Sequence, residues 1–192
     1  DYAGDKNCPE EIRALSLLAI SKLLEWTQIS NSKLKKVLIQ CVNDDSPVIK
    51  STSLLAMAQE VRQRPIKEYL DIFIKYSRDE NLSIRENALL GINHFLDVEH
   101  LNNLELEDIA RENFYSQNDS IRANSFYIFG KIINRAPKLN LMSDDLALLL
   151  NVAARGFYEE SRAATFALAI ITNRNSKMIK SPIQKDKIEI LC

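Results

Sequence analysis

Glycine and proline are scarce in this chain. Only four glycines and five prolines occur among 192 residues, whereas β-sandwiches and barrels need turn residues about every eight to twelve positions. This scarcity argues against an all-β fold and favours long helices. The hydrophobic content of 46% is too high for a disordered chain and is sufficient for a substantial core.

The sequence also lacks an excess of charge of either sign. It carries 25 basic and 26 acidic residues, so there is no chain-wide positive charge of the kind that binds nucleic acids. Its three cysteines (Cys8, Cys41 and Cys192) are odd in number and widely spaced, which favours a reducing compartment over a disulfide framework. No signal-peptide pattern and no run of about 18 apolar residues occurs. We therefore expect an intracellular protein, cytoplasmic or nuclear, with no membrane contact.

Catalytic and metal-binding motifs are missing as well. The chain contains no G-x-x-x-x-G-K, G-x-G-x-x-G, G-x-S-x-G or H-E-x-x-H sequence. Its two histidines, His94 and His100, would lie on different faces of a continuous helix, and no residues at zinc-site spacing surround them. We expect no enzyme activity, no cofactor, no metal and no small-molecule substrate.

A repeated pattern is present instead. An apolar residue followed by a basic one recurs at Ile12-Arg13, Ile49-Lys50, Ile84-Arg85 and Ile121-Arg122, with Ser161-Arg162 as a variant. Three residues after each basic residue comes a small side chain, in the order Ser16, Ser53, Ala88, Ser125 and Thr165. The next residue is large and apolar: Leu17, Leu54, Leu89, Phe126 and Phe166. This spacing predicts one buried helix face per copy, and the small residue allows neighbouring helices to approach closely.

Helix-start residues precede each copy of the pattern. The turn 43–47, for example, supplies cap side chains, acidic residues and a proline suited to a first helical turn. Further amphipathic stretches lie upstream of the turns, at 32–42, 66–77, 105–115 and 144–155. Each unit is therefore predicted to be a helix, a short turn and a second helix, and the second helices start near residues 10, 47, 82, 119 and 159. Asn81 and Asn118 begin glycosylation sequons but also occupy cap positions, and the two interpretations are alternatives.

The stretch Asp44-Asp45-Ser46-Pro47-Val48-Ile49-Lys50 resembles the opening of the second helix in HEAT repeats, where an acidic turn leads into an apolar-basic pair. The resemblance extends from about residue 8 to residue 180, and armadillo repeats are a near neighbour. It implies an all-α, right-handed α–α superhelix of about four to five helical hairpins, with residues 1–192 forming a single array. Neither end carries the polar outer face of a capping repeat, and residues 185–191 look like the opening of a further helix. We therefore interpret the chain as a segment of a longer solenoid.

The resemblance also selects candidate residues for partner contact. HEAT repeats usually place their second helices on the concave side, and a polar row falls nine residues after the basic residue of each copy. The candidates in or near this row are Lys22, Trp26, Gln59, Arg62, His94, Lys131, Arg135 and Arg174. The alternative is an ordinary solvated helix face opposite the apolar stripe.

Acidic and basic residues are also segregated along the sequence. The turns within units are acidic, as at 44–45 and 79–80, while connections between units are basic, as at 62–67 and 174–180. Stacked connections could form a basic rim that binds phosphates or acidic peptides. Acids at helix starts and bases at helix ends are also ordinary helix electrostatics, so both interpretations stay open.

These observations favour a non-catalytic interaction scaffold, a subunit of a larger complex, that binds protein or peptide partners along a curved surface. One alternative is a HEAT segment associated with nucleic acid in a chromosome-organising or RNA-processing assembly, which would use the basic rim. A further alternative is a HEAT-like DNA glycosylase that removes alkylated bases, with Trp26, Tyr127 and Arg135 beside a flipped base. The sequence leaves the partner and the pathway open.

Overall fold

The computed structural model describes residues 2–27, 32–99, 101, 104–135, 141–156 and 158–174. All regular secondary structure in these ranges is α-helical, which confirms the predicted all-α class. The helices are α1 (Glu10–Trp26), α2 (Ser32–Val42), α3 (Pro47–Gln63), α4 (Lys67–Tyr76), α5 (Leu82–Val98), α6 (Leu104–Glu112), α7 (Asp119–Arg135), α8 (Ser143–Arg155) and α9 (Tyr158–Arg174). None of these helices is long and apolar enough to cross a membrane.

The chain divides into two compact units, Asp1–Glu99 (unit 1) and His100–Cys192 (unit 2). The single array of hairpins over residues 1–192 therefore stays a prediction. The predicted helical opening at 185–191 lies outside the described residues.

The helices marked by the repeat pattern are α1, α3, α5, α7 and α9, and each has 17 residues. Side-chain caps define several of their starts. The Ser46 hydroxyl accepts a hydrogen bond from the N–H of Ile49, and Asn81 Oδ1 accepts from the N–H groups of Ser83 and Ile84. Asn118 Oδ1 likewise accepts from a backbone N–H of α7 at 3.0 Å. Both sequon asparagines thus cap helices, which satisfies backbone donors that the helix itself leaves unpaired.

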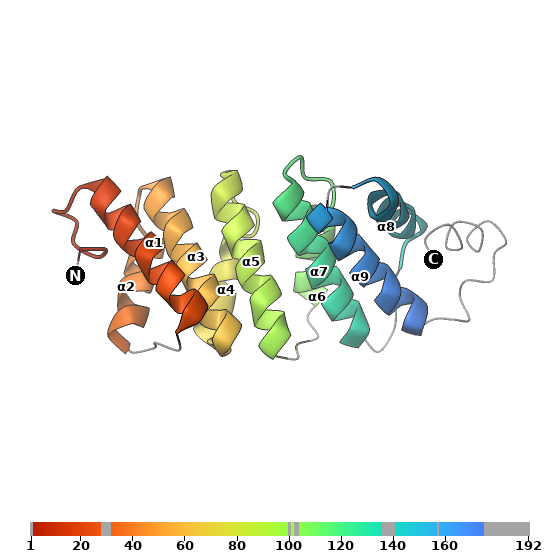
Figure 1. Ribbon diagram of the computed structural model, residues 1–192, viewed down its shortest axis with the longest axis horizontal. Helices are drawn as coiled ribbons and strands as arrows, with labels where there is room; N and C mark the ends of the chain where they lie inside the picture. The colour runs from red at the N-terminus through yellow and green to blue at the C-terminus, as the bar shows by residue number, and fades with distance from the viewer. Residues whose placement is uncertain are drawn as a thin grey trace. The chain divides into compact units, whose positions relative to one another are not determined.

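Unit 1 is built in two layers. Helices α1, α3 and α5 lie side by side and run in the same direction, while α2 packs on α3 and α4 packs on α5 (Figure 1). Helix α3 is therefore covered by α1 on one side and by α5 on the other. Its small residue Ser53 is fully buried and donates a hydrogen bond to the carbonyl oxygen of Leu38 in α2 at 2.8 Å. Small side chains at this position let the helices approach closely, as the repeat pattern predicts.

Unit 2 uses the same elements, because α6 packs on α7, α8 packs on α9, and α7 packs on α9. An aromatic cluster fills the space between α6 and α7. The ring of Phe114 lies 5.0 Å from that of Phe126 and 5.1 Å from that of Phe129, the second pair at 88°. The Arg111 guanidinium lies over the Phe129 ring at 4.8 Å. Edge-to-face packing and a cation above a ring both add to the stability gained from burial.

The repeat is shifted by one residue in α9. The pattern at Ser161-Arg162 predicts that Thr165 makes the close helix contact, but Thr165 is exposed and Ala164 is fully buried. Glu160 is buried at the position where α3, α5 and α7 carry isoleucine. Its carboxylate accepts a hydrogen bond from Arg122 Nε of α7. The predicted register of this copy is therefore wrong by one residue, because a buried ion pair replaces the apolar residue that marks the other copies.

Gly91 lets α5 approach α4 closely. A Cβ atom at this position would lie 2.4 Å from the ring of Phe73, which is itself fully buried and has little room to move. We expect Gly91→Ala to lower the free energy of unfolding by up to about 2 kcal/mol, because overpacking costs about 1–3 kcal/mol and the better helix propensity of alanine returns only about 1 kcal/mol. Urea denaturation measures the change.

In a Phe73→Leu background the smaller side chain leaves room for the added methyl group. The same Gly91→Ala change should then be neutral or stabilising. An equal loss in both backgrounds would contradict the contact.

Candidate functional site

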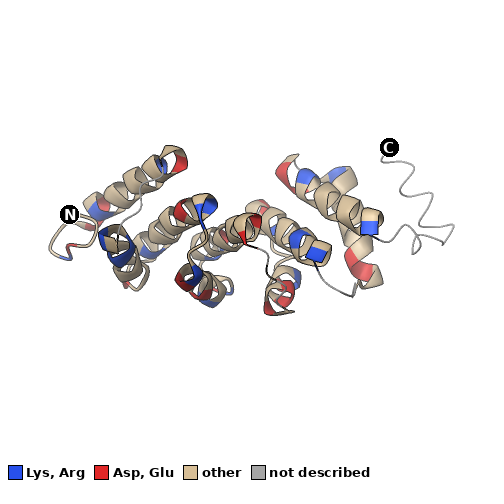
Figure 2. Cartoon of the chain, turned by 90° about the horizontal axis from the view of Figure 1, so that it is seen from below, with Lys and Arg blue, Asp and Glu red and all other residues tan. Residues whose placement is uncertain are grey.

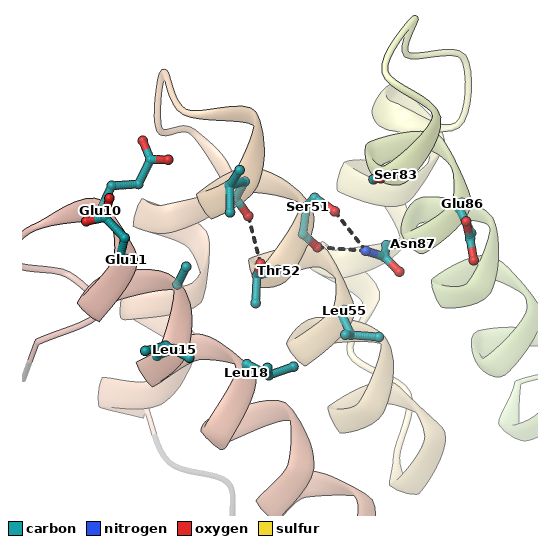
Figure 3. A pocket seen from close by; sticks show the side chains of 12 residues that line it. Glu10, Glu11, Leu15, Leu18, Ser51, Thr52, Leu55, Ser83, Glu86 and Asn87 are labelled. Carbon is teal, nitrogen blue, oxygen red and sulfur yellow. Dashed lines mark hydrogen bonds between the residues drawn. The ribbon is translucent and has the colours of Figure 1, made fainter.

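A groove of about 770 Å³ crosses the N-terminal halves of α1, α3 and α5 in unit 1 (Figure 3). We call it the α1–α3–α5 groove. Its apolar lining comes from Ala14, Leu15 and Leu18 of α1 and from Val48 and Leu55 of α3. Leu15 is 61% exposed, Leu18 41% and Val48 51%. Large apolar side chains gathered on a concave surface are typical of a binding site for another molecule.

Hydrogen bonds within the groove tie its helices together. The Asn87 amide nitrogen of α5 donates to both the carbonyl and the hydroxyl oxygen of Ser51 in α3, each at 3.0 Å. The Thr52 hydroxyl donates to the carbonyl oxygen of Val48 at 2.7 Å. Figure 3 shows the Asn87–Ser51 bonds between α5 and α3, and the Thr52 bond within α3. The groove is therefore part of the helix packing and is formed before any partner arrives.

Three carboxylates stand at the edges of the groove. Glu10 and Glu11 extend from the first turn of α1, and Glu86 extends from α5 on the opposite side, with Leu15 and Leu18 lower in the groove (Figure 3). The groove thus has an apolar floor and an acidic boundary on both sides.

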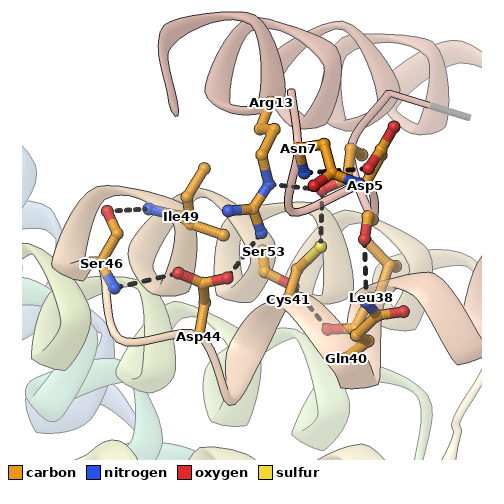
Figure 4. A network of polar contacts seen from close by, with 12 residues as sticks. Asp5, Asn7, Arg13, Leu38, Gln40, Cys41, Asp44, Ser46, Ile49 and Ser53 are labelled. Carbon is orange, nitrogen blue, oxygen red and sulfur yellow. Dashed lines mark hydrogen bonds and ion pairs between the residues drawn. The ribbon is translucent and has the colours of Figure 1, made fainter. Parts of the chain in front are cut away.

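A buried ion pair holds α1 in place beside α3. Arg13 is 7% exposed, and its Nη2 lies 2.5 Å from Oδ2 of Asp44 in the turn between α2 and α3. Its Nε donates to the carbonyl oxygen of Ala3, which also accepts a hydrogen bond from the Cys41 thiol (Figure 4). The sequence pattern marks Arg13 only as a repeated basic residue. The structure shows that it fixes the helix that forms one wall of the groove.

This network shifts the pKa values of its members. Burial alone would raise the pKa of the Asp44 carboxyl, but hydrogen bonds from Arg13 and from the Ser46 N–H, together with the charge of Arg13, hold it below its ordinary value of 3.8. The hydrogen bond to Asp44 raises the pKa of Arg13. Burial raises the pKa of the Cys41 thiol, which stays protonated and donates to Ala3.

We expect Asp44→Asn to lower the free energy of unfolding at pH 7 by about 3 kcal/mol, because the change leaves a buried guanidinium without its counterion. The folded-state pKa of Asp44 lies below the unfolded one, so the pair gives its full stability above the unfolded pKa of about 3.9 and loses it as the pH falls through the folded value. The difference between wild type and variant should therefore shrink below pH 3.8. Urea denaturation at a series of pH values measures it.

Asp45→Asn is the matched control, because the neighbouring carboxylate is exposed. It should change stability by less than about 0.5 kcal/mol at every pH. A cost for Asp44→Asn that does not depend on pH would contradict the role of its charge.

The predicted contact residues occupy several different environments. Trp26 is 85% exposed at the end of α1, and Arg62 is exposed near the end of α3. Lys22 is exposed and pairs with Glu25 on its own helix at 2.8 Å. Lys131 and Arg135 of unit 2 are half-buried. None of the eight candidates lines the α1–α3–α5 groove. Their role in partner contact stays a prediction.

Two of the predicted contacts are used in helix packing. His94 Nδ1 of α5 lies 3.0 Å from the carbonyl oxygen of Ala58 in α3 and carries the hydrogen, since a carbonyl can only accept. Arg174 Nη1 at the end of α9 donates to the carbonyl oxygen of Ile133 in α7. Gln63 at the end of α3 makes the equivalent contact to the Leu24 carbonyl oxygen of α1. Polar side chains on these rows thus bind the neighbouring helix, a role that the spacing alone does not predict.

Gln59 differs from the exposed candidates in its burial. It is 8% exposed, because α3 is covered by a helix on each side, whereas Lys22 at the equivalent position of α1 has such a neighbour only in α3. A side chain this deeply buried has little surface to offer a partner. Its Oε1 has no hydrogen-bond partner among the described residues.

We expect Gln59→Met to raise the free energy of unfolding by about 1 kcal/mol. Methionine keeps a similar volume and removes a buried carbonyl oxygen whose desolvation is uncompensated. Thermal or urea denaturation measures the change. Destabilisation by 1 kcal/mol or more would show that the amide makes a favourable interaction in solution.

Unit 2 has a hollow of its own, of about 650 Å³, between α7 and α9. It is lined in part by Tyr127 and Phe166, whose rings lie 5.5 Å apart, and by Arg162, whose guanidinium lies over the Tyr158 ring. Within the described ranges, no three His, Cys, Asp or Glu side chains gather in a way that could hold a metal ion.

Comparisons with known proteins bear on the fold of the chain and not on its function. No protein-family model matches the chain, and no curated protein matches it. Among solved structures, it is similar to the crystal structure of an engineered protein, a target of the Northeast Structural Genomics Consortium, with a TM-score of 0.66. The match covers 97% of this chain and 91% of that one at 11% sequence identity. Similarity at this level of identity concerns the fold alone.

Proposed function

We propose that this chain is a HEAT-like solenoid segment that acts as a non-catalytic interaction scaffold and binds a protein or peptide segment in the α1–α3–α5 groove. The observation that carries the proposal is the exposure of Leu15, Leu18 and Val48 on one concave surface. Burying such side chains against a partner releases about 25 cal/mol for each Å² of apolar surface. A few apolar anchors in a preformed groove are enough to supply much of the affinity of an interface.

The build of unit 1 supports this role. Its layer of parallel helices is the arrangement by which solenoid repeats present an extended surface. The groove walls are fixed by the Arg13–Asp44 pair and the Asn87–Ser51 bonds, so little ordering cost remains for binding.

The nucleic-acid alternative has weaker support. Arg64 pairs with Glu60 of its own helix at 3.2 Å, and Arg174 binds a backbone carbonyl oxygen of α7. Two of the basic side chains that the basic rim would need are therefore already engaged in contacts within the chain. Figure 2 shows basic and acidic residues interspersed along the helices of each unit. The glycosylase alternative relies on Tyr127, which is half-buried against Phe166, and on Trp26, which belongs to the other unit.

A selection from a random peptide library on the immobilised chain tests the proposal. Enriched peptides should bind the Leu15→Gln/Leu18→Gln variant at least tenfold more weakly than wild type, because each leucine loses about 1 kcal/mol of apolar burial. Fluorescence polarisation measures the affinities. Glutamine favours helix as leucine does, so α1 should stay folded.

Leu104→Gln in unit 2 is the matched control, because it removes a leucine that is 76% exposed and does not line the groove. It should leave binding unchanged. A selection that enriches no peptide, or peptides that bind the groove variant as tightly as wild type, would refute the proposed function.

A further inference from the structure

We infer that the partner segment of the α1–α3–α5 groove is basic, with Lys or Arg residues on both sides of one or two apolar anchors. The inference deepens the proposed function and rests on it. Among the twelve residues that line the groove, three are glutamates and none is lysine or arginine. The acidic side chains stand on opposite sides of the apolar floor, Glu10 and Glu11 on α1 and Glu86 on α5 (Figure 3).

The helix starts beneath the groove do not cancel this charge. Each helix N-terminus contributes about half a positive charge, so α1, α3 and α5 together supply about +1.5 against three carboxylates. The residues that line the groove therefore carry a net negative charge.

The spacing of the carboxylates limits the partner further. Neighbouring packed helices lie about 8–10 Å apart, so two spacings separate the α1 edge from the α5 edge by about 16–20 Å. An extended chain covers this distance in about five or six residues and a helix in about 11–13. The partner thus carries two basic positions at one of these separations with apolar residues between them. An acidic segment of the same length would meet like charges at both edges.

Two synthetic peptides test this inference, with nine and fifteen residues to match the extended and helical spacings. Each has two lysines at either end and two leucines in the centre, and each has a counterpart with glutamates in place of the lysines. We expect one lysine peptide to bind wild type at least tenfold more tightly than its counterpart at low salt. In the Glu11→Gln/Glu86→Gln variant this ratio should fall at least threefold, since exposed charge pairs contribute up to about 1 kcal/mol each.

The control variant is Asp71→Asn/Asp108→Asn, which changes the net charge equally at exposed residues of α4 and α6 that do not line the groove. It should preserve the ratio. Equal affinity for lysine and glutamate peptides, both weakened by Leu15→Gln/Leu18→Gln, would refute the basic partner and leave the proposed docking groove intact. Failure of both lysine peptides to bind at millimolar concentration would refute the basic partner. The library selection would then test independently whether the groove binds peptides at all.

Discussion

Helix-on-helix burial between consecutive hairpins is the interaction on which the rest of each unit depends. In unit 1, α3 can bury most of its circumference only because α1 and α5 pack on either side and α2 covers a third face. Small side chains make this possible, since Ser53 and Ala88 are fully buried at helix contacts and Gly91 leaves room for the Phe73 ring. The same packing sets three helix starts side by side, and the α1–α3–α5 groove is the outer surface of that arrangement.

Most of the helical framework could be read from the sequence because its signals are local. Cap side chains, acidic turns and apolar spacing act within a few residues of each helix start, and α1, α3, α5 and α7 begin at Glu10, Pro47, Leu82 and Asp119, where these signals stand. The register of helix α9 differs from the predicted one because the interaction that sets it is not local. Glu160 occupies a buried position only through its bond to Arg122, which lies 38 residues earlier. A repeat pattern that requires an apolar residue at the position of Glu160 therefore predicts the wrong register.

The site was harder to predict because exposure depends on neighbours that the sequence does not specify. Lys22 and Gln59 hold equivalent positions in the repeat, yet only the first is exposed. The groove was missed for the opposite reason, since Leu15 and Leu18 look like ordinary core residues. One signal was available. Helix α1 carries leucines on more than one face, and as the first helix of the unit it packs mainly on α3, so some of its leucines remain exposed.

The charge of the groove shows how one set of residues can satisfy two physical demands. Acidic side chains at helix starts stabilise the helix by about 0.3–1 kcal/mol each, which explains Glu10 and Glu11 without any partner. The carboxylates of Glu10 and Glu11 nevertheless remain exposed to solvent beside the apolar floor of the groove. Glu86 lies beyond the first turn of α5, where the helix dipole gives little benefit, so the dipole alone does not explain this glutamate. A nearly neutral chain can therefore line one groove with glutamates as its only charged residues.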